Sequence, residues 1–187
     1  MATANAVATL GILETRSIAR GIQAADAMVK AAEVTLLRCR TTCPGKYLVF
    51  ITGEVSAVES AIDAGCACCG PSLVGQAVFA RIDARVVEAL TGRREAASPN
   101  AAGVVECRDV ESAVRAADAA VKAAEVELLA LRLGGGIGGK GYFVLVGDVS
   151  AVTAAVETGA SVAQDHDMLV DSVVIPRPAD SVFERLL

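Results

Sequence analysis

An internal repeat constrains the fold of this chain more than any other feature of its sequence. The nine residues 26–34 recur as residues 118–126 with eight identities, at an offset of 92. The six residues 53–58 recur as residues 147–152 with five identities at an offset of 94, so a two-residue insertion separates the matched blocks. Self-similarity at a fixed period indicates that one structural unit occurs twice. The sequence therefore predicts two similar domains of about 90 residues, a size that suffices for independent folding.

The first part of each copy predicts a strand followed by a helix. Residues 8–14 form a short apolar run, which is typical of a buried strand. Ser17 follows at a position suited to cap a helix, and Asp109 holds the matching position in the second copy. The helix predicted after Ser17 is amphipathic, because its apolar residues recur at helical spacing on one face. These residues are Ile18, Ile22, Ala25, Val29 and Ala32.

The rest of each copy completes a split βαβ pattern. Residues 34–37 and 47–52 predict a second and a third strand, and residues 73–82 predict a fourth. Between the third and fourth strands, residues 56–59 (Ser-Ala-Val-Glu) match the capping box that opens a helix. The order β-α-β-β-α-β predicts an α+β chain built from two tandem ferredoxin-like halves.

The boundary between the halves is predicted from turn-forming residues. Ser98, Pro99 and Asn100 lie between the two copies and are typical of a linker. We therefore place the first domain at residues 1–96 and the second domain at residues 97–187.

Charge and hydropathy patterning exclude several classes of partner. The formal net charge is −5, and basic residues are interspersed with acidic ones. A nucleic-acid backbone or an anionic membrane surface needs clustered Lys and Arg, so neither partner is expected. No apolar run reaches the ~20 residues that span a bilayer, and the N-terminal residues lack the pattern of a signal peptide. We expect a cytoplasmic protein whose six cysteines are reduced thiols or metal ligands.

The repeat offers an internal comparison for five of the six cysteines. Their counterparts in the other copy are small or apolar residues or threonine, so we interpret these cysteines as small core residues. The alternative is a metal site at Cys66, Cys68 and Cys69, although no His or fourth Cys is adjacent to them. The matched pairs are Cys39 with Leu131, Cys66 with Ala160, Cys68 with Val162, Cys69 with Ala163, and Cys107 with Thr15.

The two-residue insertion falls in a loop that differs between the copies. Residues 41–46 (Thr-Thr-Cys-Pro-Gly-Lys) face residues 134–140 (Gly-Gly-Gly-Ile-Gly-Gly-Lys), so Cys43 faces Ile137. The second loop satisfies two phosphate-binding glycine patterns. However, Gly141 stands where Ser or Thr would bind magnesium, and a predicted strand follows instead of a helix. We interpret its glycines as the requirement of a crowded loop near a symmetry axis, where side chains would clash.

The other polar candidates favour a structural interpretation. His166 is the single histidine, so neither a metal site nor acid–base catalysis finds a second histidine as a partner. Glu14 and Glu106 occupy matching strand ends, and a residue that is present in both copies is more typical of structure than of catalysis. We predict that the protein is not an enzyme.

In both halves, these motifs and their order resemble the bacterial microcompartment shell domain. The shared features are the strand Gly11-Ile-Leu-Glu-Thr, the helix ending at residues 26–34, the loop ending in Gly-Lys, and the helix opening at residues 53–58. Residues 173–178 also resemble the end of the family's domain. The resemblance implies that the chain forms a flat, pseudohexameric homotrimer. Such trimers tile with other shell proteins into a microcompartment shell around metabolic enzymes.

The resemblance implies roles for the two loops. Loops that end at Lys46 and Lys140 would line the central pore of the trimer. The expected pore-lining residues are Thr42, Cys43, Pro44, Gly45, Ile137, Gly138 and Gly139.

The resemblance also implies contacts at the edge of the tile. Lys30 and Lys122 match the lysine that the family places there, and Arg177 matches its partner arginine. In the first half, residues 80–82 (Ala-Arg-Ile) replace the family's Pro-Arg-Pro, so an edge contact by Arg81 is less well supported.

Residues 41–46 resemble the Thr-x-Cys-Pro-Gly-Lys motif of the tandem, trimeric (T-type) members from propanediol-utilisation compartments. In those members the motif carries an iron–sulfur cluster on the three-fold axis. The likeness implies that Cys43 from three chains holds one [4Fe–4S] cluster per trimer, with one iron left to an exogenous ligand. Electrons would then pass across the shell, with enclosed redox enzymes as partners. The alternatives are a metal-free tile whose pore conducts or gates small metabolites, and a soluble small-molecule sensor.

Overall fold

The structure is a computed structural model that describes residues 7–92 and 100–183. By its internal contacts the chain divides into two compact units, Met1–Val87 and Glu88–Leu187. The predicted linker residues Ser98 and Pro99, and the predicted boundary after residue 96, lie outside the described residues.

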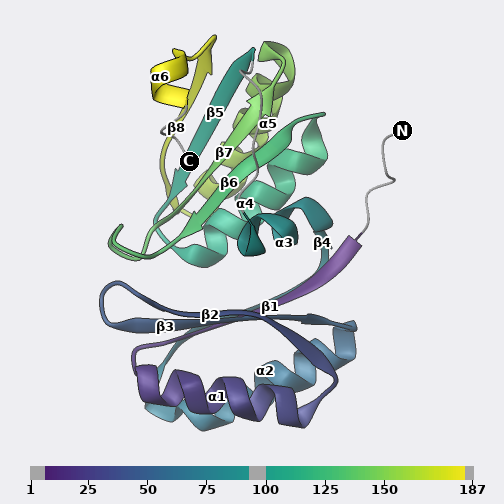
Figure 1. Ribbon diagram of the computed structural model, residues 1–187, viewed down its shortest axis with the longest axis vertical. Coiled ribbons are helices and arrows are strands. Elements are labelled where there is room, and N and C mark those ends of the chain that lie inside the picture. Colours follow the sequence, from purple (N-terminus) through teal and green to yellow (C-terminus); the bar gives the residue numbers. More distant parts are fainter. Residues whose placement is uncertain (1–6, 93–99, 184–187) are drawn as a thin grey trace. The chain divides into compact units, whose positions relative to one another are not determined.

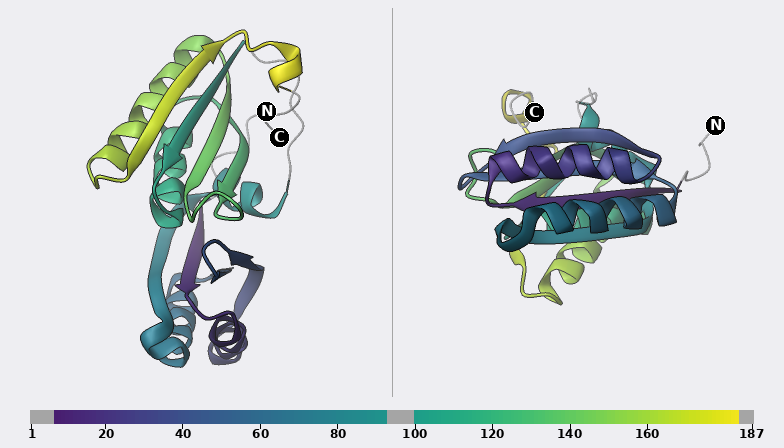
Figure 2. Two further views of the ribbon diagram at one scale, coloured as in Figure 1. Left: turned by 90° about the vertical axis from the view of Figure 1, so that its left-hand side faces the viewer. Right: turned by 90° about the horizontal axis from the view of Figure 1, so that it is seen from below.

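The first unit is a four-stranded antiparallel sheet with two helices along one face (Figure 1). Its strand order is β2-β3-β1-β4, so the strand that begins the unit lies in the interior of the sheet. Figure 2 shows the two helices lying alongside each other over this sheet. The elements are β1 (Val7–Thr15), α1 (Ile18–Ala31), β2 (Val34–Thr42), β3 (Lys46–Gly53), α2 (Val55–Cys69), a 3₁₀ turn (Gly70–Ser72) and β4 (Leu73–Asp83).

The second unit repeats this arrangement with strand order β6-β7-β5-β8. Its helices α4 and α5 pack on each other and on the strands, as α1 and α2 do in the first unit. The prediction of two ferredoxin-like α+β halves is therefore confirmed. Two short helices, α3 and α6, follow β4 and β8 and were not predicted. Helix α3 (Ala84–Thr91) contains the division between the units. The elements of the second unit are β5 (Ala101–Cys107), α4 (Val110–Ala123), β6 (Glu127–Leu133), β7 (Gly141–Gly147), α5 (Val149–Gln164), β8 (Leu169–Pro176) and α6 (Asp180–Phe183).

The helix starts confirm one capping prediction and contradict another. The Ser17 hydroxyl accepts a hydrogen bond from Arg20 N, and the Asp109 carboxylate accepts one from Ser112 N, so both residues cap their helices as predicted. The capping box at residues 56–59 is wrong, because α2 begins one residue before Ser56 and its N-cap, Glu54, makes no capping hydrogen bond through its side chain. The helix therefore starts after Glu54, and Ser56 lies inside its first turn.

Helix α1 packs through its small side chains, and its larger apolar residues are left outside. Gly21, Ala24, Ala25 and Met28 are buried. Close approach to α2 requires glycine at position 65, where a Cβ would lie 2.8 Å from Met28 Cγ and Sδ. The apolar residues predicted to share one face are split: Ala25 is buried and Ala32 half-buried, whereas Ile18, Ile22 and Val29 are 42%, 55% and 41% exposed.

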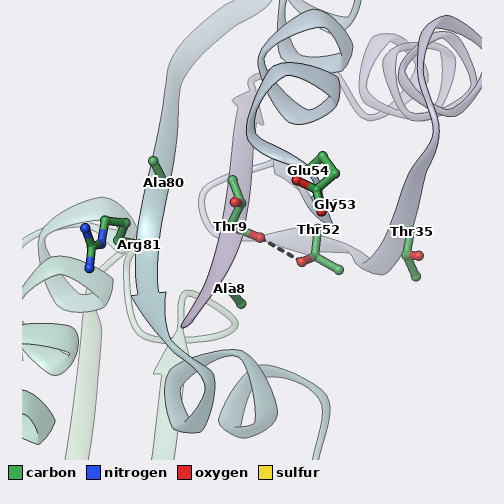
Figure 3. Close-up of a pocket in the computed structure, with 8 residues that line it drawn as sticks. All are labelled: Ala8, Thr9, Thr35, Thr52, Gly53, Glu54, Ala80 and Arg81. Carbon is green, nitrogen blue, oxygen red and sulfur yellow. Dashed lines mark hydrogen bonds between the residues drawn. The ribbon is translucent and has the colours of Figure 1, made fainter. Parts of the chain in front are cut away.

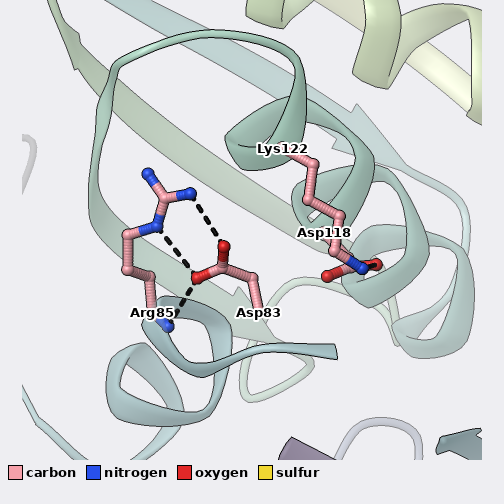
Figure 4. A network of polar contacts seen from close by, with 4 residues as sticks. All are labelled: Asp83, Arg85, Asp118 and Lys122. Atoms are coloured by element: carbon pink, nitrogen blue, oxygen red, sulfur yellow. Dashed lines mark hydrogen bonds and ion pairs between the residues drawn. The ribbon is translucent and has the colours of Figure 1, made fainter. Parts of the chain in front are cut away.

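A charged clamp fixes the turn from β4 into α3. Asp83 is 3% exposed, and its carboxylate accepts hydrogen bonds from Arg85 Nε at 2.9 Å and Nη2 at 2.8 Å (Figure 4). The backbone N–H of Arg85 donates to the same carboxylate at 2.9 Å. A buried carboxylate is stable only when it is paired and hydrogen-bonded. The bidentate contact with Arg85 therefore explains how Asp83 can stay charged although it is buried.

Within residues 7–92 and 100–183, no helix combines the length and the hydropathy that crossing a bilayer requires.

Candidate functional site

The loop with Cys43 is a tight hairpin between β2 and β3. Thr42 pairs with Lys46 in the strand ladder, so Cys43, Pro44 and Gly45 form the three-residue tip. Pro44 and Gly45 are exposed and Cys43 is half-buried. Gly45 has φ +65°, a left-handed conformation that favours glycine. Thr42, predicted to line a pore with them, lies at the end of β2 and is only 5% exposed.

The matching loop of the second unit is longer and consists mostly of glycine. It connects β6 to β7, and the N–H of Gly134 donates to Lys140 O at 2.7 Å to close it. A Cβ at Gly135, Gly136 or Gly138 would have no atom within 4 Å, so crowding inside the chain does not explain these glycines. Their conformations do, because five loop glycines have positive φ: Gly134, Gly135, Gly136, Gly138 and Gly139.

The glycine loop leads into strand β7, as predicted, and not into a helix. A phosphate-binding loop needs a helix N-terminus behind it, so the structure agrees with the rejection of nucleotide binding there. Of the other residues predicted to line a pore, Ile137 and Gly139 are half-buried and Gly138 is exposed.

An ion pair sits at the base of each hairpin. Lys46 Nζ lies 2.9 Å from Glu14 Oε1 in the first unit. In the second unit Lys140 Nζ donates a hydrogen bond to Glu106 Oε1 at 2.8 Å. Each Glu lies near the end of an interior strand, β1 or β5, and reaches the Lys that ends the loop. The pairing of Glu with Lys was not predicted, although the repeated Glu and the repeated Gly-Lys were both visible in the sequence. Their joint recurrence was the available signal.

Five cysteines pack inside the units, largely as the repeat predicted. Cys69 and Cys107 are buried, and Cys39, Cys66 and Cys68 are half-buried against the core of the first unit. Burial raises the pKa of Cys39, Cys66 and Cys69. A raised thiol pKa lowers the fraction of thiolate, the form that binds metals and attacks electrophiles.

The arrangement of donors bears on where a metal could bind. Within the described parts of the chain, no group of three or more His, Cys, Asp or Glu is arranged to hold a metal ion. This finding argues against a site at Cys66, Cys68 and Cys69. Cys43 is half-buried like Cys39, Cys66 and Cys68, but it differs from them because it sits at a hairpin tip without a second cysteine on its loop. One such thiol per chain does not fit a site inside one chain.

The residues predicted at a tile edge are exposed. Lys30 pairs with Asp26 and Lys122 with Asp118, each at 2.6 Å and four residues apart on its helix (Figure 4 shows the second pair). The Lys30–Asp26 pair is well exposed, and pairs of this kind contribute only about 0.3–0.5 kcal/mol, so Lys30 loses little when it changes partner. Asp118 is more buried, at 18% exposed. Arg177 is exposed with φ +46°, and its N–H donates to Asn100 O at 2.8 Å.

The first unit also has a shallow polar pocket at one end of its sheet. Its volume is about 410 Å³, and the residues that line it include Thr9, Thr35, Thr52, Glu54 and Arg81 (Figure 3). The Thr52 hydroxyl is already used, because it donates to Thr9 O at 2.7 Å. His166, the single histidine, belongs to the second unit, where it is exposed, and contributes nothing to this lining.

Comparison with known proteins gives one family for both units. The BMC domain family matches residues 9–82 and 101–178. The chain is 43% identical over 178 residues to the bacterial microcompartment shell protein PduT of Citrobacter freundii, covering 95% of this chain and 97% of that protein. The carboxysome shell protein CsoS1B of Halothiobacillus neapolitanus is 42% identical over 89 residues, covering 46% of this chain and 80% of its own length.

A solved structure agrees with the sequence relatives. The crystal structure of a microcompartments protein from Desulfitobacterium hafniense DCB superposes with a TM-score of 0.92 at 41% identity. The match covers 96% of this chain and 99% of that one. With both units matched by one domain family and nearly the whole chain aligned to shell proteins, this chain belongs to the BMC domain family as a tandem, two-domain microcompartment shell protein.

Proposed function

We propose that the protein is a trimeric shell tile in which Cys43 from three chains holds one iron–sulfur cluster at a central pore. Two shell domains per chain require three chains to supply the six domains of a hexagonal tile. A three-fold axis would bring three copies of the Cys43 hairpin together. The observation that carries the proposal is the half-buried thiol of Cys43 at the tip of a tight hairpin that only one of the two units has.

Assembly with further copies is supported by apolar side chains that the chain leaves uncovered. Ile18, Ile22, Val29 and Leu36, on the neighbouring elements α1 and β2, are 41–55% exposed. Their counterparts in the second unit are Val110, Val114, Val121 and Leu128, all 3% exposed or less. Exposed apolar side chains gathered on one face mark contact surfaces. A closed ring of copies would cover this face in every chain.

The residues of the hairpin suit a shared cluster. Thiolates are the usual ligands of iron–sulfur clusters, and a [4Fe–4S] cluster takes four, so three Cys43 thiolates would leave one iron to an exogenous ligand. Gly45 lets the backbone approach closely at the tip, where N–H groups can donate to cluster sulfur. When bound, the group supplies one-electron transfer. The hairpin's part is to hold three thiols in place and to narrow the pore.

The decisive experiment is purification without oxygen, followed by measurement of iron and acid-labile sulfide per chain. We expect about one cluster per three chains, with matching absorption and spin-resonance spectra. Cys43→Ser should lose the iron while the oligomer persists, and Cys68→Ser is the matched control that should keep it. If wild-type protein binds no iron even after anaerobic reconstitution, the cluster is excluded. The pore would then serve small metabolites, which is the second candidate function.

Tiling with other shell proteins is proposed to use Lys30, Lys122 and Arg177. These side chains are exposed, and each of the two lysines forms an ion pair with an Asp four residues earlier on its own helix. Replacing both lysines by Asp should abolish sheets seen by electron microscopy and leave trimers intact in sedimentation. Sheets that persist in the double variant would show that the edge lies elsewhere.

A further inference from the structure

Arg177 has a backbone conformation that a residue with a side chain rarely adopts. It stands between Pro176 and Pro178, directly after strand β8, and its φ is +46°. Proline disfavours the right-handed helical region for the residue before it, but an extended conformation stays open. A positive φ at a non-glycine residue is strained and persists only where its surroundings hold it. The contacts around Arg177 must therefore hold this turn in place.

The backbone nitrogen of Arg177 is held by Asn100. The paired register of β5 and β8 ends at Ala101 and Pro176. One residue further on, the N–H of Arg177 donates to Asn100 O at 2.8 Å. This bond ties the nitrogen of Arg177 to the sheet, so the chain leaves the sheet at the Cα atom of Arg177 and no earlier.

Asn100 is itself anchored through its side chain. Its Nδ2 atom donates to Asp148 Oδ1 at 2.7 Å. Asp148 is the residue before helix α5, and its side chain makes no capping bond to that helix, so its carboxylate can serve Asn100. A hydrogen bond to an ionised acceptor is roughly twice as strong as one between neutral groups. Asp148 thus holds Asn100, and Asn100 holds Arg177.

The first unit lacks this arrangement, and its last strand behaves differently. Ala8 stands at the position of Asn100, at the offset of 92, and has no side-chain donor. The ladder there continues to Asp83, so that Arg81, the residue matched to Arg177, lies inside strand β4. The early turn therefore occurs in the unit that has the Asn–Asp contact.

The turn determines where the side chain of Arg177 points. In an extended strand, side chains alternate between the two faces of the sheet, and the positive φ takes Arg177 out of this alternation. Arg177 is exposed, and within residues 7–92 and 100–183 its guanidinium group makes no hydrogen bond or ion pair. A guanidinium presents its N–H donors in a rigid fork, so its direction decides which acceptors it can reach.

We propose that Asn100 is a positioning residue for assembly. By joining Asp148 to the backbone of Arg177, it fixes the turn that presents the Arg177 guanidinium to carboxylate or carbonyl oxygens of a neighbouring copy of this protein. This inference rests on the proposed use of Arg177 at the tile edge. The hold of Asn100 on the turn is a property of the single chain and is tested separately.

The first test measures amide hydrogen exchange of Arg177, by mass spectrometry of the peptide that contains it, at a concentration below assembly. Pro176 and Pro178 carry no N–H, so the Arg177 amide has no neighbours to confuse the signal. Asn100→Ala and Asp148→Ala should each speed its exchange by about three- to tenfold, because the carbonyl of residue 100 loses its anchor. Asp148→Asn keeps an oxygen acceptor and should stay within about twofold of the wild type. Unchanged exchange in both alanine variants would overturn the positioning role.

The second test measures the lowest concentration at which the purified protein forms sheets, by pelleting and electron microscopy. Asn100→Ala should raise this concentration by about three- to tenfold, while sedimentation velocity shows the same oligomer as the wild type. Asp148→Asn should assemble like the wild type. Glu54→Ala is the matched control, because Glu54 precedes helix α2 as Asp148 precedes α5, and it too should assemble like the wild type.

Arg177→Lys separates positioning from general stabilisation. Lysine keeps the charge on a flexible stem, so it depends less on the direction of the backbone than arginine does. Asn100→Ala should therefore impair assembly less in the Arg177→Lys background than in the wild type. An equal effect in both backgrounds would mean that Asn100 only stabilises its unit, and would overturn the proposal.

The outcomes also separate this inference from the proposed function. If Arg177→Ala forms sheets at the wild-type concentration, the proposed use of Arg177 at the edge is wrong, and the assembly role of Asn100 fails with it. The exchange measurement then still decides whether Asn100 holds the turn. If Arg177→Ala loses the sheets while Asn100→Ala keeps them at the wild-type concentration, the edge role of Arg177 stands and this inference alone fails.

Discussion

The two hairpin loops show how one duplicated scaffold came to carry two different tips. Both loops end on a lysine that pairs with a glutamate of an interior strand, Glu14 in the first unit and Glu106 in the second. Above that shared base, the first loop is a tight turn with a cysteine, and the second is a longer glycine loop with an isoleucine. The Lys–Glu pair thus fixes the position at which each loop ends, whereas the length and the residues of the loop differ between the units. A site that needs one thiol per chain can therefore be built on one unit only.

The helices that follow β1 and β5 also differ between the units, in the burial of matching apolar residues. Val114 in α4 is fully buried, while its counterpart Ile22 in α1 is 55% exposed. The two residues have similar size and apolar character and occupy the same place in the same fold. Local sequence therefore does not decide which of them is covered. The difference shows that the first unit keeps open a face whose equivalent in the second unit is closed.

The largest effect expected from this comparison comes from placing a charge at the two matched positions. Val114→Asp should lower the free energy of unfolding by about 3 kcal/mol or more, because an unpaired charge would be buried. Ile22→Asp should change the stability of the monomer by about 0.5 kcal/mol or less, as at other exposed positions. It should nevertheless prevent assembly. Urea unfolding at low protein concentration measures the first quantity, and sedimentation velocity measures the second.

Two controls sharpen that comparison. Ile22→Val introduces the residue found in the second unit and should leave both properties nearly unchanged. If Ile22→Asp destabilises the chain as much as Val114→Asp, the first-unit face is packed within the chain and is not an open interface. If the Asp variant still forms trimers, another surface joins the copies.

A smaller effect on stability is expected at two contacting positions where each unit has one glycine and one larger residue, in opposite order. In the first unit a Cβ on Gly21 would lie 2.5 Å from Tyr47 Cδ1. The second unit has Ala113 and Gly141 at the matching positions, and there a Cβ on Gly141 would lie 2.4 Å from Ala113 Cβ. Each unit thus has room for one side chain of the pair to grow. Gly21→Ala should cost about 2 kcal/mol through overpacking.

A double-mutant cycle tests whether the size of residue 47 determines the cost of a side chain at residue 21. Gly21→Ala should cost less in a Tyr47→Gly background than in the wild type, because that background reproduces the second unit. Denaturant unfolding of the four proteins gives the coupling, which should exceed about 1 kcal/mol for residues in contact. Costs that simply add would mean that Tyr47 moves away without penalty when the alanine is introduced.

Much of the fold could be predicted from the repeat, and the failures have physical reasons. Residues that cap helices, such as Ser17 and Asp109, act through neighbours in sequence, so local patterns found them. The apolar stripe of α1 misled because it is wider than the surface that the rest of the unit covers, which leaves Ile18, Ile22 and Val29 exposed. Ile22 has the pattern of a core residue although its own unit leaves it exposed, and one chain cannot show a second copy that would cover it.

The candidate site was only partly predictable for a related reason. Cys43 was found because its loop departs from the repeat. The Glu14–Lys46 pair was missed because its partners are 32 residues apart and meet only when β1 and β3 become neighbours. The glycines of the second loop were correctly placed in a loop, and the structure adds a reason that the sequence did not show, because five of them have positive φ. Crowding near a symmetry axis stays a prediction.

The smallest effect expected from the comparison concerns Cys107, which stands where the first unit has Thr15. Burial, followed by the nearby charges of Asp109 and Glu106, raises the pKa of this thiol from its ordinary value of 9.0 to about 11. The unfolded chain therefore loses this proton near pH 9, while the folded chain keeps it until about pH 11. Between these values the native state binds more protons, so the stability that Cys107 contributes below pH 9 is lost as the pH rises.

The predicted loss is about 1–2 kcal/mol between pH 9 and pH 11, after allowance for partial screening of the nearby charges by solvent. Cys107→Thr installs the residue of the first unit and should flatten the fall in unfolding free energy across that range, while Cys68→Ser should leave the fall unchanged. Urea unfolding at several values of pH measures it. An equal slope in wild type and Cys107→Thr would place the alkaline loss on other groups. The raised thiol pKa would then have no counterpart in stability, and the two units would differ at this position in packing alone.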